Sequence, residues 1–396
     1  MKLTNILVAL IFLSALPLLT ACEKSSWSKK SSINAPAPSA KKKWVRRKTF
    51  QTAKLGNLAM QFNGEKIFLV ARDFEKSDAT NREIILAIND NGEAVGDLEI
   101  KGRVKDLSVS GSGNHVLAQL EDGSIFLIEG FDEKEKRFDL GKADDAVLSP
   151  TGQFIVLKKD GSYSAVSSDG KELWRYPAGV EQIIFPFLNN PDSSFIASAG
   201  SVAFWVGGNE IWKRNITGSP VALSSSFLEG GLLAVATAGE KGEIHFFNDK
   251  GEELGSVPFS GGAKSLSCSR LGNLCAAYGN GKNGQVVAVF KSDGTDVWSH
   301  AVKGEASRDS RVVFTGKGIA KQTSARNSKN TPAKENMFSV IAGFEAEGIH
   351  SLRAWDEKGN PLWYIPVEEE ILGYEVSWNA KKLNILTERS IEYFTW

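Results

Sequence analysis

Two of the three cysteines in this 396-residue sequence are spaced for disulfide chemistry. Cys268 and Cys275 flank a short predicted turn, so pairing of the strands on either side would set them opposite each other. Opposed cysteines can form a disulfide in an oxidising compartment, and opposed side chains come closest where the pair is not joined by backbone hydrogen bonds. The sequence leaves two states open, a disulfide or two buried thiols.

Other motifs that resemble catalytic or binding sites are interpreted as turns. Residues 279–284 match Gly-x-Gly-x-x-Gly, but a strand-like run follows them, and a pyrophosphate site needs a helix N-terminus there. Residues 89–93 resemble a calcium loop without its bidentate glutamate. The four histidines are scattered, with no i, i+4 pair and no nearby carboxylate cluster. We therefore expect no catalytic residue, no metal, no cofactor and no enzymatic activity.

The third cysteine, Cys22, ends a segment with the layout of an export signal. Lys2 precedes an apolar stretch over residues 6–19, which is shorter than the roughly 20 residues of a permanent membrane helix. The segment Leu19-Thr20-Ala21-Cys22 resembles the lipobox of bacterial lipoproteins, in which the cysteine is acylated and becomes the new N-terminus. The resemblance implies a signal peptide over residues 1–21 and a lipid anchor at Cys22. An ordinary secretory signal is the alternative.

The net charge of zero is the sum of two parts of the chain with opposite net charges. Residues 23–48 carry nine cations and one anion, whereas residues 49–396 hold 37 basic and 46 acidic side chains, a net charge of −9. The whole chain therefore gives no support for nucleic-acid binding. Residues 22–43, rich in Ser, Ala, Pro and Lys, are predicted to be a flexible tether, which either binds anionic headgroups or is a soluble spacer.

The remaining chain repeats with a period of roughly 40 residues, which is typical of four-stranded propeller blades. An apolar strand ends in a Ser-x-x-Gly turn at residues 149–152 and 269–272, and two further predicted strands follow. Each unit ends in a turn and a strand with Gly-x-x-apolar-Trp. This element occurs at residues 170–174, 208–212, 294–298 and 359–363, while 92–96 and 251–255 have Gly in place of Trp.

Counting these units predicts an all-β domain over residues 44–396. Seven units start near residues 55, 101, 141, 179, 217, 260 and 303, and residues 368–396 supply only about three strands. We expect the segment 44–50 to add the fourth strand, because closure of the ring removes an open sheet edge. The prediction is an eight-bladed β-propeller of four-stranded antiparallel blades, with seven blades as the alternative, and a monomer.

The segment 165–176, AVSSDGKELWRY, is similar to the repeat of quinoprotein (PQQ-like) propellers, while the Ser-x-x-Gly turns also resemble WD40-type blades. Together with the lipobox, eight such blades resemble the propeller lipoprotein of the bacterial outer-membrane barrel-assembly machinery. The quinone itself is not expected, because PQQ dehydrogenases are much longer and no calcium-ligand set is apparent. The repeated tryptophans are interpreted as packing between blades rather than as ligand-stacking residues. These tryptophans are Trp174, Trp212, Trp298 and Trp363.

The enlarged loops at residues 75–81, 279–284, 303–310 and 322–336 are expected to share the face on which propellers usually dock partners. For the long insertion at residues 322–336, solvated disorder is the alternative to a docking role. The last two units concentrate basic residues that are candidates for docking a cell-envelope protein. These candidates are Lys282, Arg308, Arg311, Lys317, Lys321, Arg326, Lys329 and Lys334.

The function expected from these features is a lipid-anchored periplasmic scaffold, for which the resemblance suggests a role in outer-membrane protein assembly. A ligand- or carbohydrate-binding sensor is the alternative, followed by a propeller enzyme. Glu23 after Cys22 differs from the aspartate that favours inner-membrane retention, so the outer membrane is the expected location. The inner membrane and the cell surface stay open.

Overall fold

The computed structural model contains β-strands and no helix within the residues it describes. These residues are 43–49, 53–61, 64–73, 82–89, 92–131, 135–186, 192–226, 231–238, 242–259, 261–269, 271–281, 284–302, 305–306, 311–315, 339–346, 348–377 and 382–395. They belong to one compact unit, Ser31–Trp396. None of the described residues forms an apolar helix of membrane-spanning length.

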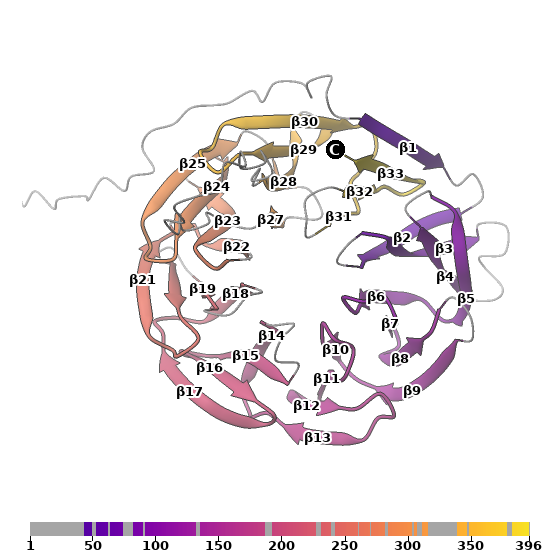
Figure 1. Cartoon of the computed structure of the whole chain (residues 1–396), viewed down its shortest axis with the longest axis horizontal. Coiled ribbons are helices and arrows are strands. Elements are labelled where there is room, and N and C mark those ends of the chain that lie inside the picture. Colours follow the sequence, from indigo (N-terminus) through magenta and orange to yellow (C-terminus); the bar gives the residue numbers. More distant parts are fainter. Residues whose placement is uncertain are drawn as a thin grey trace, which may run out of the picture. The chain divides into compact units, whose positions relative to one another are not determined.

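The first four blades follow one another along the chain around the ring (Figure 1). Blade 1 contains β2 (Ala53–Met60), β3 (Lys66–Asp73), β4 (Arg82–Asn89) and β5 (Ala94–Lys101). Blade 2 contains β6 (Val104–Val109), β7 (His115–Leu120), β8 (Ser124–Glu129) and β9 (Lys136–Lys142). Blade 3 contains β10 (Asp145–Leu148), β11 (Ile155–Lys159), β12 (Ser162–Val166) and β13 (Glu172–Arg175). Blade 4 contains β14 (Val180–Ile184), β15 (Ser193–Ser198), β16 (Ser201–Val206) and β17 (Asn209–Asn215).

Blades 5 to 7 continue the ring, and blade 7 has a divided inner strand. Blade 5 contains β18 (Pro220–Ser225), β19 (Leu233–Thr237), β20 (Glu243–Phe247) and β21 (Glu253–Pro258). Blade 6 contains β22 (Ala263–Cys268), β23 (Leu274–Gly281), β24 (Gly284–Lys291) and β25 (Asp296–Val302). Blade 7 contains β26 (Glu305–Ala306), β27 (Val312–Thr315), β28 (Ser339–Ala346), β29 (Ile349–Trp355) and β30 (Pro361–Val367). Both β26 and β27 pair with β28, so together they take the place of one inner strand.

Blade 8 joins the two ends of the described chain. It contains β31 (Gly373–Val376), β32 (Lys382–Leu386) and β33 (Ser390–Thr395), and its fourth strand is β1 (Lys43–Thr49). β1 pairs with β33 in antiparallel register, from Lys43 opposite Thr395 to Thr49 opposite Ser390. The predicted eight-bladed ring closed by the N-terminal strand is therefore confirmed, and the seven-bladed alternative is excluded.

The first turn of several blades depends on a buried serine, which explains the Ser-x-x-Gly pattern. In blade 3, the amide of Ser149 donates to the carbonyl oxygen of Phe154 at 3.0 Å, and the serine hydroxyl accepts from the Phe154 amide at 3.2 Å. Ser269 makes the same two contacts with Leu274 in blade 6, at 2.8 and 3.1 Å. A hydroxyl that satisfies a buried amide in this way holds the two innermost strands at one register.

The Gly-x-x-apolar-Trp element contains a β-bulge. In blade 4, Trp212 pairs with Phe204 and Glu210 pairs with Trp205, so Ile211 has no partner across the strands. The same irregularity falls at the apolar position of blades 1, 3, 5, 6 and 7. A bulge shifts the alternation of the strand by one residue, which turns the tryptophan inward and the apolar residue outward. Ile211 is accordingly 57% exposed.

The hydrophobic core consists of layers between neighbouring blades. One cluster joins Trp298 and Val289 of blade 6 to Val312 and Phe344 of blade 7. Another joins blade 8 to blade 1 through Leu386, Ile391, Leu55 and other apolar residues. Because each layer is shared by two blades, no blade buries its apolar surface alone. Ring closure therefore supplies a core layer as well as a strand.

Candidate partner-binding face

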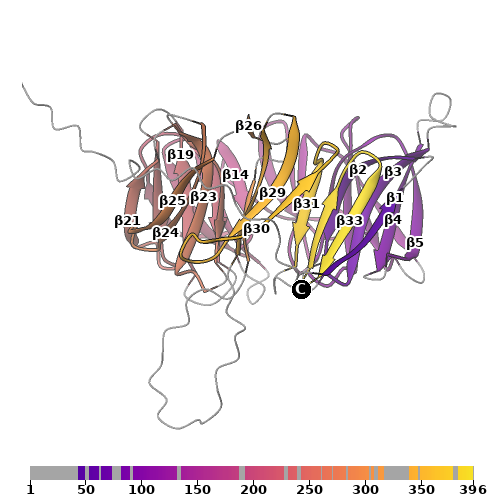
Figure 2. The same ribbon diagram turned by 90° about the horizontal axis from the view of Figure 1, so that it is seen from above.

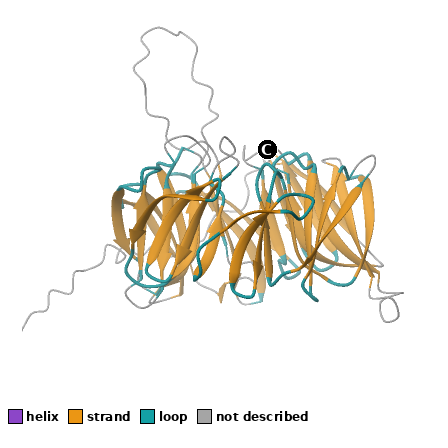
Figure 3. Cartoon of the chain, turned by 90° about the horizontal axis from the view of Figure 1, so that it is seen from below, coloured by secondary structure: helices purple, strands orange, loops and turns teal. Residues whose placement is uncertain are grey.

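The two faces of the ring differ in the connections they carry. Connections from the second to the third strand of each blade, and from one blade to the next, lie on one side, which we call the blade-entry face. Turns between first and second strands and between third and fourth strands lie on the opposite face. Figure 2 shows the ring edge-on, with the strands running between these two faces. Figure 3 gives the same edge-on orientation from the other side, with the described loops in teal at both ends of the strands.

The strands that flank three of the four enlarged loops end at the blade-entry face, as expected from the sequence. Residues 75–81 lie between β3 and β4 in the sequence, residues 279–284 include the end of β23 and the first residue of β24, and residues 303–310 fall at the start of blade 7 around β26. The fourth expectation is wrong. Thr315 of β27 pairs with Ser339 of β28, so the insertion that contains residues 322–336 joins a first strand to a second strand and leaves from the opposite face.

Seven of the eight basic docking candidates lie outside the described residues. These seven are Lys282, Arg308, Lys317, Lys321, Arg326, Lys329 and Lys334. Five of them, at positions 317, 321, 326, 329 and 334, fall within the insertion between β27 and β28. Of the eight candidates, the structure describes Arg311, and a docking role for the other seven stays a prediction.

Arg311, the described candidate, forms contacts between blades 7 and 8. Its Nη1 atom lies 3.0 Å from Oε1 of Glu375, and Nη2 donates to the carbonyl oxygen of Tyr374. The guanidinium carbon lies 4.9 Å from the centre of the Tyr374 ring. Arg311 precedes β27 and keeps 37% of its side chain exposed, so it combines a structural contact with a partly accessible charge.

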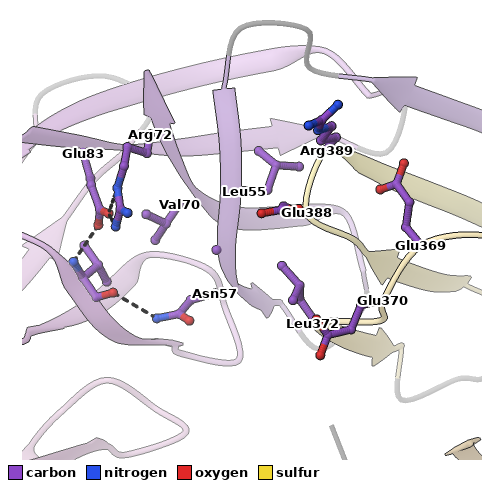
Figure 4. A pocket seen from close by; sticks show the side chains of 12 residues that line it. Leu55, Asn57, Val70, Arg72, Glu83, Glu369, Glu370, Leu372, Glu388 and Arg389 are labelled. Atoms are coloured by element: carbon purple, nitrogen blue, oxygen red, sulfur yellow. Dashed lines mark hydrogen bonds and ion pairs between the residues drawn. The ribbon is translucent and has the colours of Figure 1, made fainter. Parts of the chain in front are cut away.

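A cavity of about 570 Å³ opens on the blade-entry face where blade 8 meets blade 1. Its walls come from the start of β2, the second half of β3, the start of β4, the start of β6, and the β30–β31 and β32–β33 connections (Figure 4). The backbone amide of Leu55 donates to the carbonyl oxygen of Glu388 at 2.8 Å and joins the two blades at the rim. The cavity exists only because the first and last blades meet there.

One wall of this cavity is held by a buried carboxylate. Glu83 is 3% exposed, and its Oε1 atom accepts from Nε of Arg72 at 2.8 Å and from Nη2 of the same guanidinium. Its Oε2 atom accepts from the backbone amide of Val104 at 2.6 Å. These bonds join the β3–β4 end of blade 1 to the first residue of β6 in blade 2. A buried carboxylate with a guanidinium and an amide on its two oxygens is satisfied, so this wall is rigid.

The remaining charges at the cavity are mainly negative. Glu369, Glu370 and Glu388 line the blade 8 side together with Arg389, and Glu369 accepts a hydrogen bond from the hydroxyl of Thr387. The apolar part of the lining comes from Leu55, Val70, Val104 and Leu372. The rim thus has more carboxylates than guanidinium groups, and the walls beneath it are apolar. Such a cavity favours binding of an amphipathic group that carries a positive charge.

The four repeated tryptophans lie in the layers between blades. Trp212 and Trp298 are 7% and 9% exposed, Trp363 is 1% exposed, and Trp174 is half-buried. The indole of Trp212 donates to the carbonyl oxygen of Asp249 at 2.8 Å, and that of Trp298 donates to Glu357 at 3.1 Å. In both cases the acceptor lies in the third turn of the next blade. The tryptophans therefore do not contribute to the cavity.

Glycine in the next blade makes room for these indoles. Gly251 has a φ of 75°, and a Cβ atom there would lie 2.6 Å from Cδ2 of Trp212. Where glycine replaces the tryptophan, the backbone itself fills the space. A Cβ atom on Gly255 would lie 2.1 Å from the carbonyl oxygen of Asp293 in the next blade. The units without tryptophan thus use a closer approach of two backbones.

The cysteine pair lies in blade 6, far along the chain from the cavity residues. Cys268 and Cys275 are directly opposite in the β22–β23 register, with their sulfur atoms 3.3 Å apart and not bonded to each other. Both side chains are buried. Burial raises the pKa of the Cys275 thiol well above its usual range, and the neighbouring Cys268 adds to this.

The other motifs considered in the sequence form turns. Gly281 and Gly284 pair with each other at the end of the β23–β24 hairpin, so Gly-x-Gly-x-x-Gly is not followed by a helix. The amide of Glu93 donates to Oδ1 of Asn89 at 2.9 Å, which closes the turn at residues 89–93. Across the described residues, no three His, Cys, Asp or Glu side chains are grouped to hold a metal ion. Cys22 lies outside these residues.

Sequence reasoning did not identify the cavity residues. Glu83 could have indicated the site, because this charged residue lies on the buried side of β4 together with Ile85 and Ala87. A charge at such a position marks a specific partner, here Arg72. No pattern along the chain predicted that residues 369–372 and 388–389 would lie against residues 55–57.

The fold and the cavity define the class of this protein as an eight-bladed β-propeller. No family model matches the sequence, and no curated protein matches it. Solved structures of propellers do match. Sqt1 from Chaetomium thermophilum, bound to the N-terminus of the ribosomal protein L10, aligns with a TM-score of 0.60 at 13% identity over 87% of this chain and 97% of Sqt1.

Two further propellers are similar in structure. BamB from Moraxella catarrhalis aligns with a TM-score of 0.56 at 12% identity, over 90% of this chain and 100% of BamB. The Dos1 propeller aligns with a TM-score of 0.55 at 15% identity, over 89% of this chain and 95% of the Dos1 chain. At these identities the comparisons establish the propeller fold.

Proposed function

We propose that this chain is a non-enzymatic scaffold, anchored by lipid at Cys22 on the periplasmic side of the bacterial outer membrane. Its blade-entry face docks another cell-envelope protein during outer-membrane protein assembly. The observation that carries the proposal is the cavity between blades 8 and 1, which opens on that face and is lined by apolar and acidic side chains.

The position of the N-terminal strand supports separate anchoring and docking sides. β1 begins at Lys43, opposite Thr395, and this end of the strand lies on the face opposite to the cavity. A tether that precedes Lys43 joins the ring on that side, which leaves the blade-entry face free for a partner. The lipobox at residues 19–22 and the basic residues between it and Lys43 fit such a tether.

The similar propellers support the role of the fold as a protein-docking scaffold. The Sqt1 structure contains a segment of another protein, the N-terminus of L10. BamB shares the ring over nearly all of both chains, and the propeller lipoprotein of the barrel-assembly machinery is the family that the sequence resembles. The partner expected here presents a Lys or Arg beside an apolar side chain. The reason is that the cavity rim carries more carboxylates than guanidinium groups, and the walls beneath the rim are apolar.

Photo-crosslinking from the two faces tests the docking proposal. A photoreactive residue is placed at Arg389, which is exposed at the cavity rim, or at Lys358, which is exposed in the β29–β30 turn of the opposite face. We expect position 389 to capture an outer-membrane assembly protein in cells and position 358 to capture none. Equal capture of the same protein from both positions would contradict the proposal, as would capture of no envelope protein from position 389.

Charge reversal tests the chemistry of the cavity. Glu370→Lys at the rim is compared with Glu252→Lys, a change of equal charge at an exposed residue of the opposite face. We expect Glu370→Lys to lower the crosslink yield severalfold and Glu252→Lys to leave it unchanged, because the charge interaction is short-ranged in salt. Saturation of the cavity by a free oligosaccharide, with no captured protein, would favour the sensor alternative.

Lipid attachment is tested by metabolic labelling with palmitate. We expect label in the full chain and its loss in Cys22→Ala. Label that persists in the variant would rule out the anchor at this residue.

A further inference from the structure

The register of the cysteine pair bears on the two states that the sequence leaves open, a disulfide or two buried thiols. The neighbouring pair, Ser269 and Leu274, is hydrogen-bonded through the Ser269 amide at 2.8 Å. Hydrogen-bonded and non-hydrogen-bonded pairs alternate along antiparallel strands, so Cys268 and Cys275 form a non-hydrogen-bonded pair. The amide of Cys268 donates instead to Oγ of Ser224 in blade 5, at 2.9 Å. The two cysteines thus occupy the position that brings opposed side chains closest.

The distance between the sulfur atoms fits a bond that forms with little movement. The sulfurs are 3.3 Å apart, and a disulfide is about 2.05 Å long. The backbone separation of a non-hydrogen-bonded pair, about 4.5 Å between Cα atoms, lies within the range of disulfides. Rotation about the two Cα–Cβ bonds is sufficient, so the strands do not have to move apart or slide.

We propose that Cys268 and Cys275 form a disulfide while the chain folds, and that closure of the ring then fixes their oxidation state. The two thiols lose two protons and two electrons as the S–S bond forms. The electrons and protons pass to a disulfide-bearing oxidant, which is reduced to two thiols. In an oxidising compartment a thiol–disulfide oxidoreductase is the class of enzyme that supplies this oxidant.

The fixed oxidation state follows from burial. Cys275 is 0% exposed and Cys268 is 4% exposed, so neither sulfur can be reached by a second thiol in the folded ring. Burial also raises the pKa of the Cys275 thiol, which keeps the reactive thiolate scarce. Exchange therefore requires opening of blade 6. A chain that folds reduced stays reduced, and a chain that folds oxidised resists reductant.

Alkylation after denaturation tests the bond itself. The mature chain is refolded in a mixture of oxidised and reduced glutathione, then denatured and treated with iodoacetamide, and the two cysteines are read separately from Cys22 by peptide mass spectrometry. We expect no alkylation at Cys268 or Cys275 unless a reductant is added first. In Cys275→Ala, Cys268 should be alkylated without reductant. Alkylation of both cysteines in the unreduced native sequence would overturn the proposal.

A second measurement tests whether the disulfide forms before the ring has folded. Folded, reduced protein is incubated with oxidised glutathione, and its rate of disulfide formation is compared with that of the refolding chain. We expect the folded protein to react at least about 100-fold more slowly. Equal rates would overturn the fixed oxidation state while leaving the bond intact. The oxidised protein should also melt at a higher temperature than the reduced protein, and Cys275→Ala should remove this difference.

Discussion

At the scale of residues, contact between blades depends on matched pairs of large and small side chains. Trp212 of blade 4 lies against Gly251 of blade 5, where a Cβ atom would be 2.6 Å from the indole. The repetition of tryptophan at one position predicted packing of this kind. The matching glycine is less apparent, because the first glycine of the motif also has to adopt a positive φ in its turn. Gly251 thus adopts the backbone conformation that its own turn requires and also leaves room for the indole of the preceding blade.

Adjacent residues of β17 provide a direct test of this contact. Trp212→Ala should lower the free energy of unfolding by about 3 to 5 kcal/mol, because it removes a buried side chain and leaves a cavity. Ile211→Ala, at the exposed position of the bulge, should change it by less than about 0.5 kcal/mol. Chemical denaturation of both variants measures the difference. Similar losses in the two variants would show that the indole is not a principal contact between the blades.

His300 adds a pH dependence to another of these contacts. Its ring lies 4.9 Å from Trp298, and Nε2 is 2.7 Å from the carbonyl oxygen of Gly359. Burial lowers the pKa of His300 below 6.5, and the hydrogen bond to Gly359 opposes this shift only in part. Because the unfolded chain takes up the proton first as pH falls, the folded state loses stability as pH falls below about 6.5.

The variant His300→Gln should remove this contribution. Between pH 7.5 and pH 5.5, the melting temperature of the native sequence should fall further than that of the variant, by on the order of 1–2 °C. Thermal melts at both pH values measure this. Other groups titrate in both proteins and cancel in the comparison. An equal fall in both proteins would mean that the proton affinity of His300 is the same in the folded and unfolded states.

At the scale of elements, the sequence predicted the blades because their signals are local. A turn, a bulge and a tryptophan fall within five residues, and the period of about 40 residues repeats them along the chain. The face of the long insertion could not be assigned in the same way. The inner strand of blade 7 is divided into β26 and β27, and the sequence analysis placed the insertion on the same face as the other enlarged loops. Pairing of Thr315 with Ser339 shows that the insertion follows the first strand of the blade instead.

Deletion of residues 322–336 tests the consequence of this topology. Because the flanking strands end on the face opposite to the cavity, the deletion should leave the crosslink from position 389 unchanged within about twofold. The measurement is the yield of the same adduct in cells that produce the full or the shortened chain. A severalfold loss of the adduct would show that the insertion takes part in docking.

At the scale of the whole molecule, ring closure produces both the stability and the candidate site. β1 completes blade 8, and the seam of blades 8 and 1 forms the cavity. The closing strand could be predicted from a count of strands. The cavity could not, because Arg72 and Arg389 are joined in space only after the ring is closed. A site made from the two ends of a chain leaves no local pattern in its sequence.

The melting temperature of two truncated chains tests ring closure most directly. One chain begins at residue 43 and keeps β1, and the other begins at residue 50 and lacks it. Loss of β1 removes the backbone hydrogen bonds to β33 and exposes a strand edge on blade 8. We predict that the first chain melts within about 2 °C of the mature protein, and that the second melts at least about 10 °C lower. Equal melting temperatures for the two truncated chains would contradict closure of the ring by the N-terminal strand.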